Sequence, residues 1–266
     1  MKKREEIKNN NALTVWKIWG IPVFGGNKRQ VLNLVEKRLV EKKKHWWIAT
    51  VNPEFVMTAF KDKKFGKLLK EETSLNVADG IGLIWAKEVI RGEGCLKTGV
   101  EVLRGKYKNE VIAGSELVED FCKLAKKRNY RMFFLGGFGD RAKRTAAYFK
   151  GRYDGLKVNW CQGRPEVKNG QVLAKINKFR PNFLLVAYGM KKQEEWIREN
   201  LTKLNVGVVM GVGRSFDYYS GDLKKAPKSW RKMGLEWLYS LIQEPRRWKR
   251  QLALVRFVRK VMREKD

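Results

Sequence analysis

The feature of this 266-residue chain that most constrains its fold is a series of short apolar runs, each followed by a helical pattern. The runs are almost continuously apolar, which is typical of strands that are covered on both faces. They occupy residues 45–51, 74–78, 110–114, 130–137, 156–160, 182–189 and 206–213. We therefore predict an α/β fold with a Rossmann-like, mainly parallel sheet and helices on both faces.

This strand–helix pattern stops near residue 222, and the remaining residues contain no strand-like run. We predict an α/β core over residues 1–222 and a helical appendage over 223–266, with two helices separated near Pro245. In the last helix, basic residues surround apolar ones that recur at helical spacing: Trp248, Leu252, Val255, Val258 and Met262. A basic amphipathic helix of this kind is expected to lie on an anionic membrane surface.

The charge of the chain is strongly positive, with 58 Lys and Arg against 28 Asp and Glu and a net charge of +30. Such a surface suits a polyanionic partner: nucleic acid, anionic lipid or a phosphorylated substrate. Three widely spaced cysteines and one histidine, His45, argue against a disulfide framework, a zinc site and a histidine-based triad. The chain also lacks a DxD triplet, so we expect no metal and no cofactor.

The N-terminal residues and the lengths of the apolar runs bear on where in the cell the protein is located. The chain starts with basic and polar residues that do not resemble a signal peptide, and no apolar run approaches the roughly 18 residues of a transmembrane helix. We therefore expect a cytoplasmic protein, attached peripherally to the inner face of the cell membrane.

Candidate catalytic side chains follow the first two predicted strands, at the edge of the sheet where ligands of such folds bind. Thr50 and Asn52 end the first strand, and Asn52-Pro53 is also an ordinary turn and helix-start signal. Asp79 ends the second strand, immediately before Gly80. It is either the N-cap of the next helix or a general base that accepts a proton from a sugar hydroxyl.

Glycine turns follow three later strands, in "LGGFGD", "AYGMKKQE" and "GVGRSFD". Glycine after a strand lets phosphate approach backbone N–H groups, so three such turns favour a nucleotide site although none is a GxGxxG fingerprint. The residues concerned are Gly136, Gly137, Gly189, Gly211 and Gly213. The C-terminal arginines Arg246, Arg247 and Arg250 are either a solvated face or a diphosphate-binding cluster.

These segments, taken together, resemble the WecG/TagA/CpsF family of bacterial glycosyltransferases. The resemblance covers roughly residues 15–255, through "TVNPEF", "ADGIGLIWA", "IAGSEL", "YGMKKQEEWI", "GVGRSFDYYSGDLKKAP" and "GLEWLYSLIQEPRRWKRQ". It implies an inverting, metal-independent transfer of an N-acetylhexosamine, N-acetylmannosamine in the family's teichoic-acid branch. The donor would be a UDP-sugar and the acceptor the C4 hydroxyl of a polyprenyl-diphosphate-linked N-acetylglucosamine.

The resemblance also implies roles for particular residues. Asp79 matches the family's proposed base, Thr50 and Asn52 the polar pocket beside it, and Gln193 the glutamine of a "PxQE"-like motif. Phe216 and Asp217 match the end of "GVGxxFD", near the nucleotide. Arg247 and Arg250 match appendage arginines that would face the diphosphate.

The chain departs from the family pattern at several positions. Val111 and Ser240 each stand at a position where the family pattern has an arginine. The identity of the donor and acceptor sugars is therefore left open. Arg104 lies in an insertion of about a dozen residues and is a candidate substitute. Further departures are Glu116 in place of Asp, Lys191 in place of Pro, and Lys225 in place of Arg.

Two other functions compete with transfer. An inactive family member could bind UDP or lipid as a scaffold. Whichever function holds, the sequence leaves a homo-oligomer open. A basic nucleic-acid-binding protein would also account for the net charge of +30, but the basic residues are spread along the chain without a recognised binding motif, so we expect no specific nucleic acid. An NAD dehydrogenase is disfavoured because its fingerprint is absent.

Overall fold

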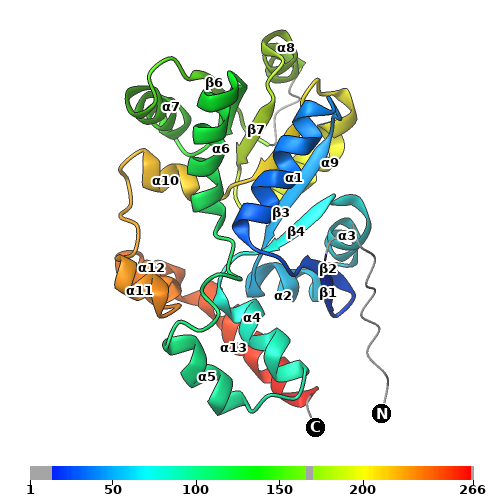
Figure 1. The fold of residues 1–266 in the computed structure, drawn as a ribbon, viewed down its shortest axis with the longest axis vertical. Helices are drawn as coiled ribbons and strands as arrows, with labels where there is room; N and C mark the ends of the chain where they lie inside the picture. Colours follow the sequence, from blue (N-terminus) through cyan, green and yellow to red (C-terminus); the bar gives the residue numbers. More distant parts are fainter. Residues whose placement is uncertain (1–13, 166–169, 265–266) are drawn as a thin grey trace.

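A six-stranded parallel sheet forms the centre of the protein (Figure 1). The structure is a computed structural model that describes residues 14–165 and 170–264. The strand order is β4-β3-β8-β7-β5-β6, which confirms the predicted Rossmann-like, mainly parallel sheet. The strands are β3 (Trp46–Val51), β4 (Leu75–Ala78), β5 (Arg131–Gly136), β6 (Lys157–Cys161), β7 (Phe183–Ala187) and β8 (Val208–Gly211).

Helices cover both faces of this sheet because alternate strand residues point to opposite sides and almost all of them are apolar. In β3, for example, Trp46 and Ile48 join one core cluster while Trp47 and Ala49 join the other. The first cluster is closed by α1 (Lys28–Val40), α6 (Gly114–Arg128) and α7 (Arg141–Arg152). The second is closed by α2 (Pro53–Lys61), α4 (Ile81–Ile90), α8 (Gly170–Phe179) and α9 (Lys192–Asn200).

Short elements complete the described fold between and after these layers. They are α3 (Lys63–Lys67), the π-helical turn η1 (Leu68–Glu72), α5 (Cys95–Leu103), the 3₁₀ turn η2 (Leu201–Lys203) and α10 (Ser215–Tyr219). The helix of the insertion, α5, packs on α4 at the lower end of the molecule in Figure 1.

An antiparallel hairpin near the N-terminus was not expected from the sequence. Its strands are β1 (Val15–Ile18) and β2 (Ile21–Phe24). The two turn residues, Trp19 and Gly20, have φ angles of 48° and 82°, a left-handed pair that suits a two-residue hairpin. Asn76 Nδ2 of β4 donates to the Pro22 carbonyl at 2.9 Å, so the hairpin lies against the edge of the sheet.

The prediction of a strand over 110–114 is wrong. The Ile112 N–H donates to the Ala78 carbonyl at 2.8 Å, which extends the end of β4 by a single hydrogen bond. Ala113 is then the N-cap of α6, which begins at Gly114. The apolar run is therefore a buried connection, and periodicity cannot distinguish such a run from a strand.

After residue 222 the described chain is helical, as predicted, but the first of the two predicted helices is split. Gly234, with φ of 71°, separates α11 (Lys228–Lys232) from α12 (Glu236–Gln243). A Cβ at this position would lie 2.6 Å from Ile81 Cγ2, so a side chain does not fit there. The 3₁₀ turn η3 (Pro245–Arg247) then leads into α13 (Trp248–Arg263).

Helix α13 packs against α2 and α4 of the α/β layers (Figure 1). Phe257 and Val261 are fully buried there, in the same cluster as Phe55 and Leu83. Burying one such apolar side chain completely contributes about 1.5–3 kcal/mol to the stability of the fold. The last helix is therefore held to the rest of the fold by its own core contacts.

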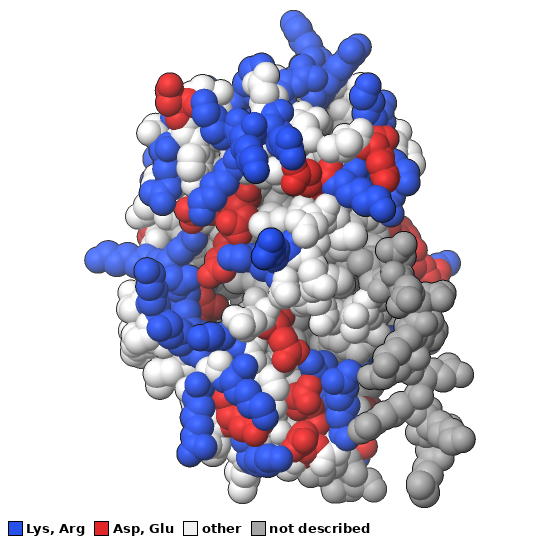
Figure 2. Space-filling view, viewed as in Figure 1, with Lys and Arg blue, Asp and Glu red and all other residues white. Residues whose placement is uncertain are grey.

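On the face drawn in Figure 2, the positive charge lies in several places rather than in one stripe. Figure 2 shows Lys and Arg over the upper end, the left flank and the lower end of the face in view, with Asp and Glu among them. Within residues 14–165 and 170–264, no helix has both the length and the apolar character needed to cross a bilayer.

Candidate active site

A cavity of about 670 Å³ opens at the carboxyl ends of four adjacent strands, β4, β3, β8 and β7. Each of these strands delivers residues to its lining: Asp79 after β4, Asn52 after β3, Gly213 after β8 and Gly189 after β7. Loops at this edge are where parallel α/β sheets bind their ligands. The structure therefore brings the segments after these four strands together around one cavity.

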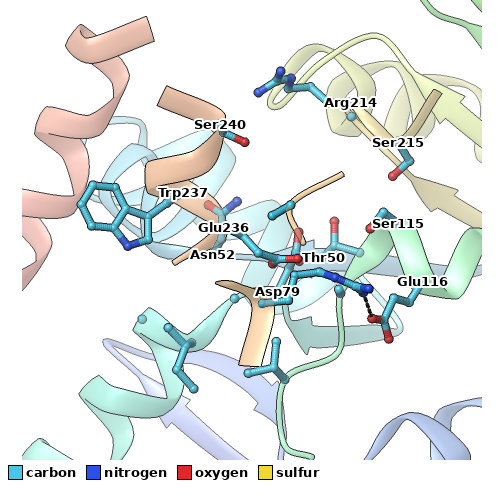
Figure 3. Close-up of a pocket in the computed structure, with 18 of the residues that line it drawn as sticks. Thr50, Asn52, Asp79, Ser115, Glu116, Arg214, Ser215, Glu236, Trp237 and Ser240 are labelled. Atoms are coloured by element: carbon cyan, nitrogen blue, oxygen red, sulfur yellow. Dashed lines mark hydrogen bonds and ion pairs between the residues drawn. The ribbon is translucent and has the colours of Figure 1, made fainter. Parts of the chain in front are cut away.

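Asp79 lies at the base of the cavity (Figure 3). Of the two alternatives for Asp79, the N-cap of the following helix is excluded, because the N-cap of α4 is Gly80 and no side chain caps that helix. Asp79 Oδ1 instead accepts from the Gly114 N–H, at the start of α6, over 3.4 Å. Burial and the nearby Glu236 carboxylate raise the pKa of Asp79 to about 7. A carboxyl group with this pKa can accept a proton near neutral pH.

Thr50 and Asn52 stand beside Asp79 but are already partly engaged in the fold. Asn52 is the N-cap of α2, and its Oδ1 accepts from the backbone N–H groups of Glu54 and Phe55 at 3.0 and 3.1 Å. Its Nδ2 amide is the group left to donate to a ligand. Thr50 Oγ1 donates to the Gly211 carbonyl at 3.4 Å, a long contact that a ligand oxygen could replace.

Gln193 reaches the cavity from the first turn of α9 and is almost fully buried. Its Oε1 accepts from the Gly213 N–H at 3.0 Å, and its Nε2 donates to Glu194 Oε1 at 2.8 Å. Glu194 is also buried, and desolvation raises its pKa to about 7. Gly211 faces both side chains, and a Cβ there would lie 2.5 Å from Gln193 Nε2. Gly211 therefore makes room for this pair.

The C-terminal helices close the other side of the cavity. In Figure 3, Trp237 and Ser240 of α12 lie across from Ser115 and Glu116 of α6, with Asp79 between the two helices. Ala253 and Leu254 of α13 also line the cavity. Ser240, which stands where an arginine was expected, hydrogen-bonds the side chain of Tyr218.

Arg231 of α11 places a guanidinium in the cavity lining, which sequence reasoning did not identify. Its Nη1 donates to Glu116 Oε1 at 2.8 Å, the pair drawn dashed in Figure 3. Glu116 also pairs with Lys28 at 2.8 Å, and these two cations hold the pKa of Glu116 below its usual value despite its burial. Arg104, the expected substitute for the arginine missing at Val111, is exposed and does not line the cavity.

Other cationic side chains join Arg231 around the cavity, although Glu236 stands among them. Burial lowers the pKa of Lys225 and raises that of Glu236. Charges removed from water respond more strongly to a bound anion than charges on the surface. The remaining cations of the lining are Lys108, Arg214, Lys228 and Lys232.

Of the other expected nucleotide-site residues, some lie behind the cavity rather than in its lining. Phe216 is fully buried and packs on Phe134, with ring centroids 5.2 Å apart. Asp217 accepts from Arg141 Nη1 at 2.9 Å and lies 3.6 Å from Arg214 Nε, so two arginines already balance its negative charge. Burial nevertheless raises the pKa of Asp217. Of the five glycines expected at the nucleotide site, Gly189 and Gly213 line the cavity, whereas Gly136, Gly137 and Gly211 do not.

Two further expected residues, Arg247 and Arg250, lie where η3 meets α13. Their side chains fall outside the described residues, so their facing the cavity stays a prediction. Among the residues that the structure does describe, no group of three or more His, Cys, Asp and Glu is placed to hold a metal ion.

Comparison with known proteins assigns the chain to a family. The chain is 28% identical over 249 residues to the N-acetylglucosaminyldiphosphoundecaprenol N-acetyl-beta-D-mannosaminyltransferase of Bacillus subtilis (strain 168), covering 93% of this chain and 91% of that one. It is 27% identical over 219 residues to the protein of the same description from Staphylococcus aureus (strain MW2), covering 82% and 80%. The model of the glycosyl transferase WecG/TagA/CpsF family matches residues 16–266. The chain therefore belongs to the WecG/TagA/CpsF family of glycosyl transferases.

Proposed function

We propose that this protein transfers an N-acetylhexosamine, N-acetylmannosamine in the first instance, from a UDP-sugar to the C4 hydroxyl of a polyprenyl-diphosphate-linked N-acetylglucosamine. The observation that carries the proposal is Asp79, whose carboxyl group has a pKa of about 7 at the base of a 670 Å³ cavity. The names of the two relatives describe the same sugar and the same lipid-linked acceptor. The product would be an intermediate of teichoic acid or another surface polysaccharide.

The reaction is a single displacement with inversion at the donor's anomeric carbon. Asp79 removes the proton of the acceptor hydroxyl as that oxygen bonds to the anomeric carbon, and the bond to UDP breaks on the opposite face. Thr50, Asn52 and Gln193 orient the two sugars from the floor and wall of the cavity. Each donates or accepts hydrogen bonds with sugar hydroxyls.

The leaving diphosphate needs positive charge around it, and the cavity lining supplies side chains for this. Arg231 and Lys225 approach from the C-terminal segment and Arg214 from the turn after β8. Arg247 and Arg250 would add to them from the start of α13. Such cations stabilise the negative charge that develops on UDP without a metal ion. Gly189 and Gly213 keep the turns beside the donor free of side chains.

The acceptor's lipid tail places the reaction at a membrane surface, on the cytoplasmic face where UDP-sugars are found. Trp237 of α12 and Leu254 of α13 give the cavity an apolar wall on the side of the C-terminal helices. We therefore place residues 223–266 at the inner face of the cell membrane, with the basic side chains of α13 against anionic lipid.

A UDP-release assay tests the proposal. The acceptor is synthetic polyprenyl-diphosphate-N-acetylglucosamine, and a panel of UDP-sugars serves as donors, with each donor alone as the control for hydrolysis. We expect acceptor-dependent release that is fastest with UDP-N-acetylmannosamine. Release with another UDP-hexosamine would keep the reaction but change the sugar, whereas no release with any donor would favour the inactive scaffold.

A further inference from the structure

Helix α5 carries an apolar stripe that its own fold does not cover. Leu96, Val100 and Leu103 stand at positions i, i+4 and i+7, and they are 86, 46 and 50% exposed. The opposite face of the helix, with Thr98 and Val102, is buried against the rest of the protein. Single exposed apolar residues are common on protein surfaces, but three on one face of one helix mark a contact surface. We call these three residues the α5 stripe.

Helix α13 carries a second stripe of the same kind at the same end of the molecule. Phe257 and Val261 bury one face of α13, while the other exposes the α13 stripe, which consists of Trp248, Leu252, Val255 and Met262. α4 contacts both α5 and α13, so the two stripes belong to helices that flank a common neighbour (Figure 1). Ile90, at the end of α4, is also exposed.

The charges around the α5 stripe suit an anionic bilayer. Its exposed basic neighbours are Arg91, Lys97, Arg104 and Lys106. Three of these cations have acidic partners: Arg91 pairs with Glu88 at 3.5 Å, Lys97 with Glu93 at 2.7 Å and Lys106 with Glu101 at 2.8 Å. Residues 91–108 nevertheless contain five Lys and Arg against two Glu, so the segment keeps a net positive charge. Apolar side chains rimmed by Lys and Arg are typical of helices that lie in the plane of a membrane interface.

The cavity connects the α13 stripe to the lipid-linked acceptor. Leu254 lines the cavity while its neighbours Leu252 and Val255 belong to the α13 stripe. A bilayer against α13 would therefore lie beside the cavity wall, where the acceptor's headgroup must enter. α5 would meet the same bilayer at this end of the molecule and fix the angle at which the cavity faces it, because two separated contacts define an orientation that one helix leaves free.

We propose that α5 is a second membrane-docking element, and that its stripe inserts into the interface of an anionic bilayer together with the α13 stripe. This inference rests on the proposed function in one respect: the proposed acceptor is a lipid, which explains why the protein needs a bilayer. The docking itself is a property of the surface and does not require transfer to occur.

Sedimentation with vesicles tests the inference on the full chain. The probes are vesicles of phosphatidylcholine alone and of phosphatidylcholine mixed with phosphatidylglycerol. The test variant carries Leu96→Asn, Val100→Asn and Leu103→Asn, and the control is Val40→Asn, a residue of α1 that is 66% exposed and distant from α5 in the fold. We expect the triple variant to bind mixed vesicles at least about tenfold more weakly, because three inserted side chains are lost, and the control to bind as the wild type does.

A second variant guards against damage to the helix. Leu96→Glu changes a single side chain that is already in solvent, so it should leave the thermal unfolding curve unchanged and still weaken vesicle binding. Wild-type binding by both folded variants would overturn the proposal. The same result accompanied by a lower solution mass would also overturn it, and would assign the stripe to a contact between copies of the chain.

Transfer to a water-soluble, short-chain acceptor separates this inference from the proposed function. We expect the triple variant to retain wild-type transfer to that acceptor while losing transfer to acceptor embedded in vesicles. If no variant and no wild-type protein transfers sugar, the proposed function fails. Weaker vesicle binding by the triple variant would nevertheless support the docking role of α5.

Discussion

Glu194 holds Gln193 in the cavity wall through a hydrogen bond from Gln193 Nε2 to Glu194 Oε1 at 2.8 Å. Both oxygens of the buried carboxyl group are used, because Oε2 accepts from the Lys191 N–H at 2.8 Å. Lys191 has φ of 74°, a left-handed conformation that costs about 1–3 kcal/mol for a residue with a side chain. Glu194 therefore stabilises the strained turn after β7 and orients the glutamine that this turn presents.

Glu194→Gln should lower turnover by about tenfold and the free energy of unfolding by about 1–3 kcal/mol. The new amide can accept at only one of the two positions, so an N–H donor faces another donor at the other. Turnover and thermal unfolding measure the two effects. The matched control is Glu195→Gln, one residue further along α9 and half-exposed. A variant equal to wild type in both measurements would remove Glu194 from this positioning role.

The part of the stability that Asp79 and Glu194 contribute should fall as pH rises from about 4 to about 7. The pKa values of Asp79 and Glu194 are raised to about 7, so in this range the folded state binds protons that the unfolded state has released. The stability that these protons provide is fully present below the unfolded pKa near 4 and is lost as pH passes the folded pKa. Urea unfolding at several pH values measures it. Between about pH 4 and 7, the unfolding free energy of Glu194→Gln relative to that of the wild type should rise, because the variant lacks the Glu194 contribution. An unchanged difference across this range would mean that Glu194 does not titrate as described.

Much of the sheet was predictable because its strands are buried on both faces and are therefore almost continuously apolar. The same property explains the error at residues 110–114, where a buried connection has a strand's composition but only one hydrogen bond to β4, from Ile112. The hairpin around Trp19 and Gly20 was missed because its strands are only four residues long. Neither its length nor its Trp-Gly turn is a strong sequence signal.

The site was predictable where its residues follow strands and unpredictable where the chain folds back over them. Asp79, Asn52 and Gln193 meet because the order of the strands brings their carboxyl ends together. Arg231 and Glu236 reach the same cavity from the C-terminal helices. No local pattern states which face of a short helix such as α11 will line the cavity, since that depends on how the C-terminal helices fold back over the sheet, where α13 packs on α2 and α4.

Asp79→Asn should reduce the rate of transfer by about 10² to 10⁴ without unfolding the protein. The amide keeps the size of the carboxyl group but cannot take the acceptor's proton. In the wild type, the ionised carboxylate is the active form, so kcat/KM should rise with pH and level off above about 7. The variant should lose this rising limb. Wild-type turnover by folded Asp79→Asn, judged by circular dichroism, would contradict the assignment of the base.

Gly211→Ala should damage the site from behind the cavity. A Cβ at this position would lie 2.6 Å from Glu194 Oε1 and 2.5 Å from Gln193 Nε2, so the pair must move. We expect a loss of about 1–3 kcal/mol in unfolding free energy, as for other overpacked sites, together with slower turnover. Gly151→Ala is the control, since a Cβ there meets no atom within 4 Å. Equal stability and turnover in the two variants would show that the pair tolerates displacement.

Arg231→Gln should weaken the binding of UDP about tenfold or more, whereas Arg104→Gln should leave it unchanged. Arg231 lines the cavity and donates a hydrogen bond to Glu116, while Arg104 is exposed outside the cavity. A cation in a partly desolvated cavity contributes more to binding a diphosphate than one in open solvent. Calorimetric titration with UDP at two salt concentrations measures both variants, and the wild type should lose more affinity with salt than Arg231→Gln. If Arg104→Gln is the variant that weakens binding, the cation near the diphosphate comes from the insertion rather than from α11.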